Sequence, residues 1–233
     1  MLELRSVSKR FGGIVALDNI SLKIDRELVG IIGPNGSGKT TLFNTITGHV
    51  KPDRGSILFM GSDIARASIE DRVRMGILRT FQQPKIFWSL SIEENIEGVT
   101  RDRSIVEYAL KRTGLWEKRQ RSPRSLTLGE IRRLEIARCL ALKPKLLLLD
   151  EPFAGLISSA AAELGELISD IYRELGIGVI IIEHKISHLS RLAKRIVAMN
   201  AGKIVFDAPV EEAMGMVRKL LLGGGYGEGA SRG

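Results

Sequence analysis

The stretch Gly33-Pro34-Asn35-Gly36-Ser37-Gly38-Lys39-Thr40 decides the fold. It fits the pattern G-x-x-x-x-G-K-[ST], in which a glycine-rich turn holds phosphate groups. The apolar run Leu28–Ile32 precedes it and predicts a buried strand, and residues 40–46 predict the start of a helix. Such a strand, turn and helix aim backbone N–H groups and a helix dipole at an anion. A turn that binds nothing is the plainer interpretation, which this context disfavours.

The end of this stretch holds the residues that act on a nucleoside triphosphate. Lys39 can reach the β- and γ-phosphates, and the Thr40 hydroxyl can ligate Mg²⁺. The glycines let the backbone approach the phosphates closely. We predict that the phosphate-binding residues are Gly33, Pro34, Asn35, Gly36, Ser37, Gly38, Lys39, Thr40 and Thr41.

A second signal lies more than one hundred residues further along the chain. Four leucines at residues 146–149 predict a buried parallel strand, and Asp150 and Glu151 follow at once. A carboxylate at the carboxyl end of such a strand, beside a phosphate loop, can hold Mg²⁺. The next carboxylate can take a proton from an attacking water. We therefore predict Asp150 as a metal ligand and Glu151 as a general base.

Composition narrows the class of protein. The 233 residues are 44% hydrophobic, which is enough for one large core or for one core with a smaller lobe. The net charge is +8, but the basic residues form only short clusters, which favour solvated helix faces over a nucleic-acid interface. The single cysteine, Cys139, excludes a disulfide within the chain and is expected to be buried. No signal peptide or membrane span is predicted, so we expect a soluble, cytoplasmic protein.

Periodicity and turn residues divide the chain into a strand-rich part, a helical part and a strand–helix–strand part. Besides the strands above, we predict strands at residues 2–4, 16–24, 56–60, 77–81, 179–182, 196–199 and 203–206. Helices are predicted from Ser91 onward and at residues 104–113, 130–142, 158–175 and 209–222. The predicted domains are a nucleotide-binding core at residues 1–81 and 143–222, a helical insertion at 82–142 and a flexible Gly-rich tail at 223–233.

These motifs, in this order, resemble the nucleotide-binding subunit of ATP-binding cassette (ABC) transporters over residues 2–222. The phosphate loop matches the Walker A motif, and Asp150 and Glu151 match the Walker B aspartate and the catalytic glutamate. The resemblance implies an α/β fold: a P-loop NTPase core with a parallel-containing sheet, an antiparallel β-subdomain and a helical insertion. It also implies ATP and Mg²⁺ as cofactors.

The resemblance extends to residues that no spacing rule singles out. Gln82 stands at the Q-loop glutamine, a catalytic and metal-binding position, and His184 at the switch histidine, which contacts the γ-phosphate. Phe11 stands where an aromatic ring stacks on adenine; a packing aromatic is the alternative. Thr127, Gly129 and Glu130 match the signature segment that closes over ATP.

Three departures from the family pattern accompany these matches. Leu128 replaces one glycine of the signature segment, and Glu130 replaces its glutamine. Ile157 stands where the family generally has an aspartate that links the two sites of a dimer. The loss of this aspartate puts efficient hydrolysis or tight coupling in doubt, but not nucleotide binding.

The implied function is an ATPase subunit that powers solute transport as a nucleotide-sandwich dimer. Residues 79–82 and 132–138 resemble the branched-chain amino-acid importer ATPases, so import of branched-chain or other amino acids is expected. The implied partners are an identical or related ATPase subunit, transmembrane permease subunits and, for an importer, a solute-binding protein, but no nucleic acid. Such a subunit lies at the inner face of the cell membrane. The alternatives are an exporter ATPase, a soluble non-transport ABC ATPase and a regulatory cassette that scarcely hydrolyses ATP.

Overall fold

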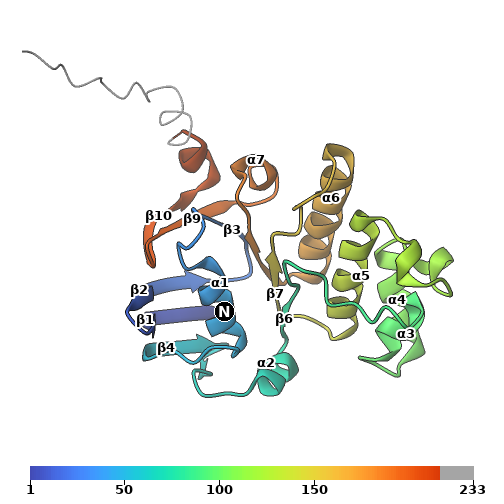
Figure 1. Ribbon diagram of the computed structural model, residues 1–233, viewed down its shortest axis with the longest axis horizontal. Coiled ribbons are helices and arrows are strands. Elements are labelled where there is room, and N and C mark those ends of the chain that lie inside the picture. Colours follow the sequence, from blue (N-terminus) through green and yellow to red (C-terminus); the bar gives the residue numbers. More distant parts are fainter. Residues whose placement is uncertain (216–233) are drawn as a thin grey trace, which may run out of the picture.

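A six-stranded sheet carries the phosphate loop in this computed structural model, which describes residues 1–215 (Figure 1). The strand order is β10-β9-β3-β8-β7-β6, and every neighbouring pair is parallel except β9 and β10. The carboxyl ends of the parallel strands therefore meet at one edge of the sheet. The strands are β3 (Leu28–Ile32), β6 (Ile77–Arg79), β7 (Leu146–Asp150), β8 (Gly178–Ile182), β9 (Arg195–Asn200) and β10 (Lys203–Pro209).

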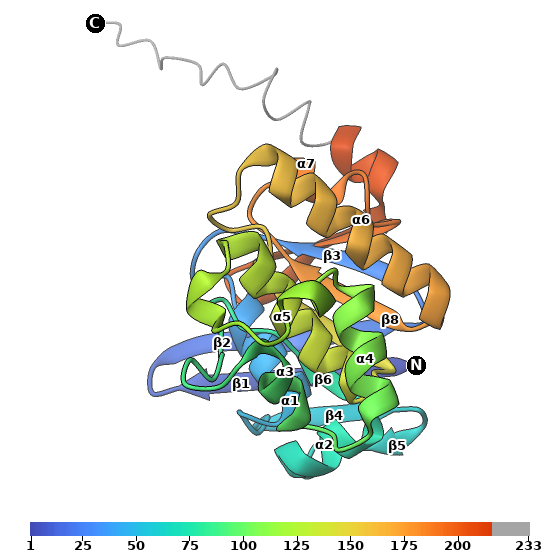
Figure 2. The same ribbon diagram turned by 90° about the vertical axis from the view of Figure 1, so that its right-hand side faces the viewer.

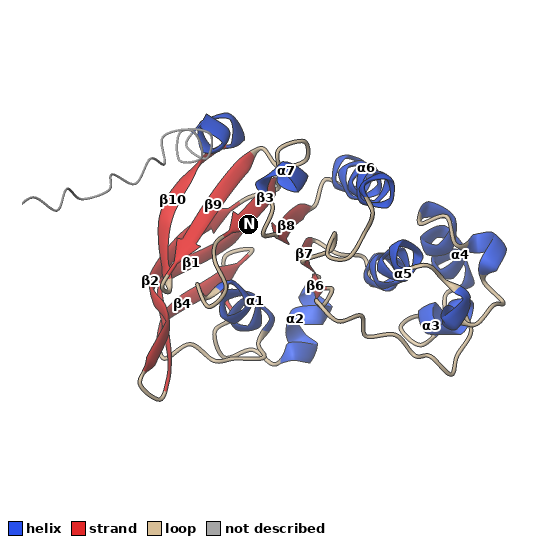
Figure 3. Ribbon diagram, turned by 45° about the horizontal axis from the view of Figure 1, so that its top comes forward, coloured by secondary structure: helices blue, strands red, loops and turns tan. Residues whose placement is uncertain are grey.

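A second, antiparallel sheet lies on the same side of the molecule as helix α1 (Lys39–Thr47; Figures 1 and 3). Its strand order is β2-β1-β4-β5. The strands are β1 (Leu2–Phe11), β2 (Ile14–Ile24), β4 (Arg54–Phe59) and β5 (Ser62–Asp63). The two sheets and the helices confirm the predicted α/β fold class.

Three of the helices form a separate layer. Helices α3 to α5 lie together beyond β6 and β7, on the side opposite the antiparallel sheet, and Figure 2 views the molecule from this side. No helix within residues 1–215 is long and apolar enough to cross a membrane. The α-helices are α1 (Lys39–Thr47), α2 (Ile69–Met75), α3 (Ile92–Glu97), α4 (Arg103–Arg112), α5 (Leu128–Ala141), α6 (Ser158–Leu175) and α7 (Ile186–Leu189), and 3₁₀ turns span Trp116–Lys118 and Pro123–Ser125.

The six-stranded sheet is buried on both faces. Along β7, Leu147 and Leu149 belong to the core shared with α3 to α6, whereas Leu146 and Leu148 belong to the core shared with α1 and the antiparallel sheet. This alternation places successive side chains on opposite faces, as in any strand. A run of four leucines is therefore what a doubly covered parallel strand requires.

Several predicted elements have different bounds in the structure. Strand β1 continues well beyond residue 4, because it pairs with both β2 and β4. Strand β6 ends at Arg79 instead of residue 81; Thr80 still donates to Leu148 O (2.9 Å), but the chain then leaves the sheet. Helix α5 begins at Leu128 instead of residue 130, because Thr127 and Glu130 form a capping box.

Two further differences concern helices. Helix α2 was not predicted, although Ser68 caps its start through the Asp71 N–H and Gly76 ends it with a positive φ. The closing helix, predicted from residue 209, begins at residue 210, because Pro209 is the last residue of β10. Its end and the predicted flexible tail lie outside the described residues, and the division into domains stays a prediction.

Candidate nucleotide-binding site

The phosphate loop connects β3 to α1 as the sequence predicts. Helix α1 begins directly after Gly38, with no side-chain hydrogen bond at its cap and no acidic residue in its first turn. Its first N–H groups and the positive end of its dipole are thus available to an anion. The side chains of Ser37 and Lys39 are buried beside the loop. This arrangement fits the phosphates of ATP.

Lys39 is held inside the loop by main-chain oxygens. Its Nζ donates to Gly33 O at 2.7 Å and to Pro34 O at 2.9 Å. Burial lowers the pKa of the Lys39 ammonium, and the nearby Glu151 and Asp150 carboxylates act in the opposite direction. A phosphate oxygen would be a stronger partner than either carbonyl, because both members of the pair would carry charge.

Asp150 and Glu151 end β7 in different surroundings. The Asp150 side chain is buried, and its Oδ2 lies 2.6 Å from Nη2 of Arg79, a residue of β6. Glu151 has a φ of 48°, in the left-handed region that disfavours residues other than glycine. The Glu151 N–H donates to Ile182 O (3.0 Å) at the end of β8, which holds this strained turn in place.

The three predicted catalytic residues converge on the Glu151 carboxylate. Gln82 Nε2 donates to Glu151 Oε2 at 3.1 Å, and His184 Nε2 lies 2.8 Å from Glu151 Oε1. They come from segments after β6, β7 and β8, which are far apart in sequence but share one sheet edge. Both carboxylate oxygens are therefore oriented by side chains of the chain itself.

The predicted metal ligands offer oxygen atoms, as a hard cation prefers. Thr40 supplies a hydroxyl, Asp150 a carboxylate and Gln82 an amide. Within the described residues, no group of three or more His, Cys, Asp or Glu side chains could hold a metal by itself. A set with one carboxylate suits Mg²⁺, which usually takes one or two carboxylates and completes its shell with water and substrate phosphates.

The structure does not link the predicted signature residues to this site. Thr127 caps α5, and within residues 1–215 its side chain hydrogen-bonds with Glu130. Glu130 also forms an ion pair with Lys118. Gly129 lies in the first turn of α5. These residues face solvent or lie half-buried, so within one chain they serve the start of the helix.

Phe11 lies at the end of β1, where β1 turns into β2. Its ring is 49% exposed, and Lys9 Nζ lies 5.4 Å from the ring centroid. This exposure does not fit an aromatic that packs in the core, and stacking on a base stays a prediction. Strand β2 also contacts the phosphate loop, because a Cβ on Gly38 would collide with Ala16 O.

Three residues at this site were missed from the sequence. Arg132 was interpreted as part of a solvated basic cluster, but it is buried and donates to Phe81 O (3.0 Å) and Gln82 O (2.8 Å). Glu183 is buried beside His184 and accepts the Phe153 N–H at 3.1 Å; burial raises the pKa of its carboxyl group. Arg79, the partner of Asp150, is the third. Glu183 directly follows the buried strand β8 and Arg79 ends β6, which was the available signal for these two residues, whereas Arg132 lies inside α5 and gave no such signal.

The sequence profile of the ABC transporter family matches residues 17–154 of this chain. The chain belongs to the ABC transporter family. It is 34% identical to the high-affinity branched-chain amino acid transport ATP-binding protein LivG of Salmonella typhimurium, over 91% of this chain and 92% of LivG. It is 35% identical to the lipopolysaccharide export system ATP-binding protein LptB of Acidithiobacillus ferridurans, over 96% of this chain and 97% of LptB.

Solved structures of ABC cassettes share the fold. A nucleotide-free ATP-binding cassette from an ABC transporter is 29% identical, with a TM-score of 0.86 over 94% of this chain and 95% of that one. A dimeric ATP-binding cassette in a post-hydrolysis state, bound to ADP and Pi, is 26% identical, with a TM-score of 0.80 over 90% and 99%. This ABC cassette is thus an ATPase subunit of a transporter.

Proposed function

We propose that this ABC cassette hydrolyses Mg-ATP with Glu151 as the general base and thereby powers the import of branched-chain or other amino acids. The observation that carries the hydrolytic part is the Glu151 carboxylate, held by Gln82 on one oxygen and His184 on the other. A carboxylate that only stabilised the fold would need neither a strained backbone nor two polar partners from separate strand ends.

Each predicted site residue has a defined role in the proposed hydrolysis of ATP. The phosphates lie on the N–H groups of the loop and of the α1 start, with Lys39 turned from Gly33 O toward the β- and γ-phosphates. Thr40, Asp150 and Gln82 would hold Mg²⁺, which supplies positive charge against the phosphate oxygens. Glu151 accepts a proton from the attacking water, and His184 contacts the γ-phosphate.

The proposed active unit contains two cassettes, identical or related, that enclose ATP between them. Thr127, Gly129 and Glu130 of one chain would close over the nucleotide held by the other. Permease subunits in the membrane would contact the helical layer, and an importer would also receive its solute from a binding protein. This proposal explains why the signature residues do not meet the phosphate loop within one chain.

The test of the hydrolytic role is Glu151→Gln, which removes the proton acceptor but keeps the shape of the side chain. We expect unchanged ATP affinity, a rate of hydrolysis lowered by roughly 10²-fold or more, and an ATP-bound dimer visible by size exclusion. The control is Glu174→Gln, on an exposed carboxylate of α6 that pairs with Arg112. Normal turnover in Glu151→Gln would assign the base elsewhere.

A lipopolysaccharide exporter is the second candidate, because the LptB relative is as similar as the LivG relative. Deletion of the gene separates the two candidates. We expect the deletion to abolish high-affinity uptake of radiolabelled leucine, isoleucine or valine and to leave lipopolysaccharide at the cell surface unchanged. Normal uptake together with loss of surface lipopolysaccharide would favour the exporter.

A further inference from the structure

Arg79 is a buried arginine with an unusual set of partners. Its guanidinium donates to Asp150 Oδ2 at 2.6 Å and to Asn44 Oδ1 at 2.5 Å, and its side chain is 6% exposed. The rings of Phe43 and Phe81 lie near its Cζ, at 5.4 and 4.9 Å from their centroids. Arg79 thus joins β6 to both β7 and α1.

The two elements that Arg79 joins are those that carry predicted magnesium ligands. Asp150 ends β7, and Thr40 lies one helical turn before Asn44 on α1. Residues four apart lie on the same face of a helix, so Asn44 stands directly below Thr40. A single planar group therefore fixes the position of one ligand and of the helix face that bears the other.

Arg72 shows what a buried arginine looks like when it only stabilises the fold. All three of its nitrogens donate to main-chain oxygens, such as Thr45 O and Ile64 O, and none contacts a carboxylate. By contrast, Arg79 Nε is buried and has no hydrogen-bond partner in the described part of the chain. Leaving a buried donor unsatisfied costs about 1–3 kcal/mol. The Arg79 guanidinium is thus placed to bind Asp150 and Asn44, although this leaves its own Nε–H without a partner within residues 1–215.

We infer that Arg79 is a positioning residue for magnesium: it holds Asp150 by one oxygen, keeps the other free for the metal, and fixes α1 at the matching distance. This inference rests on the proposed magnesium site. The guanidinium is suited to the task because its donors have a rigid, planar arrangement.

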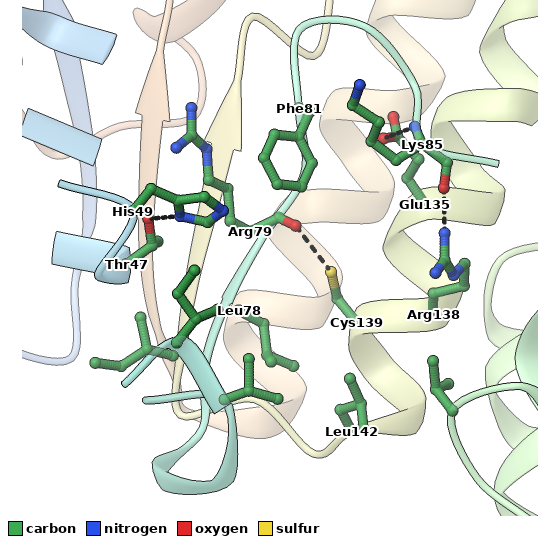
Figure 4. A pocket seen from close by; sticks show the side chains of 14 residues that line it. Thr47, His49, Leu78, Arg79, Phe81, Lys85, Glu135, Arg138, Cys139 and Leu142 are labelled. Carbon is green, nitrogen blue, oxygen red and sulfur yellow. Dashed lines mark hydrogen bonds between the residues drawn. The ribbon is translucent and has the colours of Figure 1, made fainter. Parts of the chain in front are cut away.

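The far side of Arg79 borders a pocket of about 250 Å³ between β6, the end of α1 and α5 (Figure 4). The predicted site residues do not line it, but Phe81 and His49 stand beside Arg79 in its wall. Burial lowers the pKa of the His49 imidazole, and the Arg79 and Arg72 charges lower it further.

A positioning role and a mere charge effect predict opposite results. If Arg79 acted only through its charge, Arg79→Gln would make the site more negative and strengthen magnesium binding, and Arg79→Lys would resemble the wild type. If Arg79 positions Asp150, both variants weaken magnesium binding, because neither lysine nor glutamine can hold Asp150 and Asn44 with a rigid fork.

The experiment compares the affinity for a non-hydrolysable ATP analogue, measured by calorimetry in Mg²⁺ and in EDTA. The dissociation constant in EDTA divided by that in Mg²⁺ reports how much the metal strengthens binding, without any turnover. We expect Arg79→Lys and Arg79→Gln to lower this ratio by about 10-fold, as is typical when a partner of a metal ligand is lost. Asn44→Ala removes one hydrogen bond but keeps the ion pair to Asp150, so we expect a smaller loss, about 3-fold.

Arg72→Lys is the matched control, because it makes the same change at a buried arginine that contacts no site residue. It should lower the melting temperature and leave the ratio unchanged. An unchanged ratio in the Arg79 and Asn44 variants, or a higher ratio in Arg79→Gln, would overturn the inference and leave the proposed function intact. A wild-type protein whose affinity does not depend on Mg²⁺ would overturn the magnesium site, and the inference with it.

Discussion

The phosphate loop and the signature segment both contain glycine, but for different reasons. A Cβ on Gly33 would collide with Met199 O, and one on Gly38 with Ala16 O, and both glycines have a positive φ. A Cβ on Gly129 would meet Ala160 Cβ at 3.6 Å and Leu156 Cδ2 at 4.0 Å, which are ordinary contacts. The fold therefore requires the first two glycines, whereas nothing within residues 1–215 requires the third.

Exposure separates the same two regions. Lys39 and Asp150 are buried and bonded within the chain. In the signature segment Leu128 is 39% exposed, and at the start of the next helix Ile157 is 73% exposed. Large exposed apolar side chains at the starts of two neighbouring helices favour contact with another surface. The phosphate loop is therefore built entirely from contacts within one chain, whereas the exposed signature segment supports the proposal that it acts on a partner cassette.

The largest effect is expected from a substitution in the phosphate loop. In Lys39→Ala, the cation that faces the β- and γ-phosphates is lost, and we expect ATP affinity to fall by roughly 10- to 100-fold. Calorimetry with Mg-ATP measures this, with Lys51→Ala in the exposed turn before β4 as the control. Unchanged affinity in Lys39→Ala would reject the phosphate-loop assignment.

A smaller effect is expected from a methyl group in the second region. Gly129→Ala fits the folded chain without a clash and replaces a helical glycine, so thermal stability should stay the same or rise by about 1 kcal/mol. ATP affinity should also be unchanged. The methyl group would obstruct the nucleotide of a partner cassette, so we expect the ATPase rate to fall by about 10-fold.

Gly98→Ala provides the control for this variant. Gly98 ends α3 with a φ of −62°, and a Cβ there would meet its nearest atom, Glu94 O, at 3.5 Å. This substitution should leave both stability and hydrolysis unchanged. If Gly129→Ala hydrolysed ATP at the wild-type rate, the signature segment would not approach a nucleotide. The proposal that this segment acts on the nucleotide of a partner cassette would then be rejected.

The sequence was informative where one segment defines a feature by itself. The leucine run before Asp150 predicted a strand buried on both faces, and the glycine pattern placed the loop between β3 and α1. Helix α6 has the predicted bounds, Ser158–Leu175, because apolar spacing and Gly176 define them locally. The family resemblance added Gln82 and His184, which the structure brings to Glu151.

The sequence was silent on pairs that only the fold creates. Arg79 and Asp150 are 71 residues apart and meet because β6 and β7 are neighbours. Arg132 donates to the carbonyls of Phe81 and Gln82, which are about 50 residues away in sequence. It was predicted to be solvated, but it holds the segment that carries Gln82. Charge and exposure are properties of the folded surroundings, and a short window of sequence does not contain them.

The smallest expected effect concerns Ile157, where the family generally has an aspartate. Ile157 is the N-cap of the 18-residue helix α6 and makes no capping hydrogen bond. In Ile157→Asp, the carboxylate can accept from the N–H groups of the first turn and gain about 1 kcal/mol, so the melting temperature should rise by about 2–4 °C. If a polar contact across the dimer is what this chain lacks, the plateau ATPase rate should also rise by a few-fold.

The alternative is that Ile157 packs into an apolar contact with a second cassette. Ile157→Asp would then place an unpaired charge in that contact and weaken the dimer. The ATPase rate measured against protein concentration separates the two, because packing shifts the curve to higher concentration without raising its plateau. Ile157→Asn caps α6 without a charge, so it should raise the melting temperature in either case. If neither variant raises the melting temperature, position 157 does not limit the stability of α6, and the capping argument fails independently of the dimer.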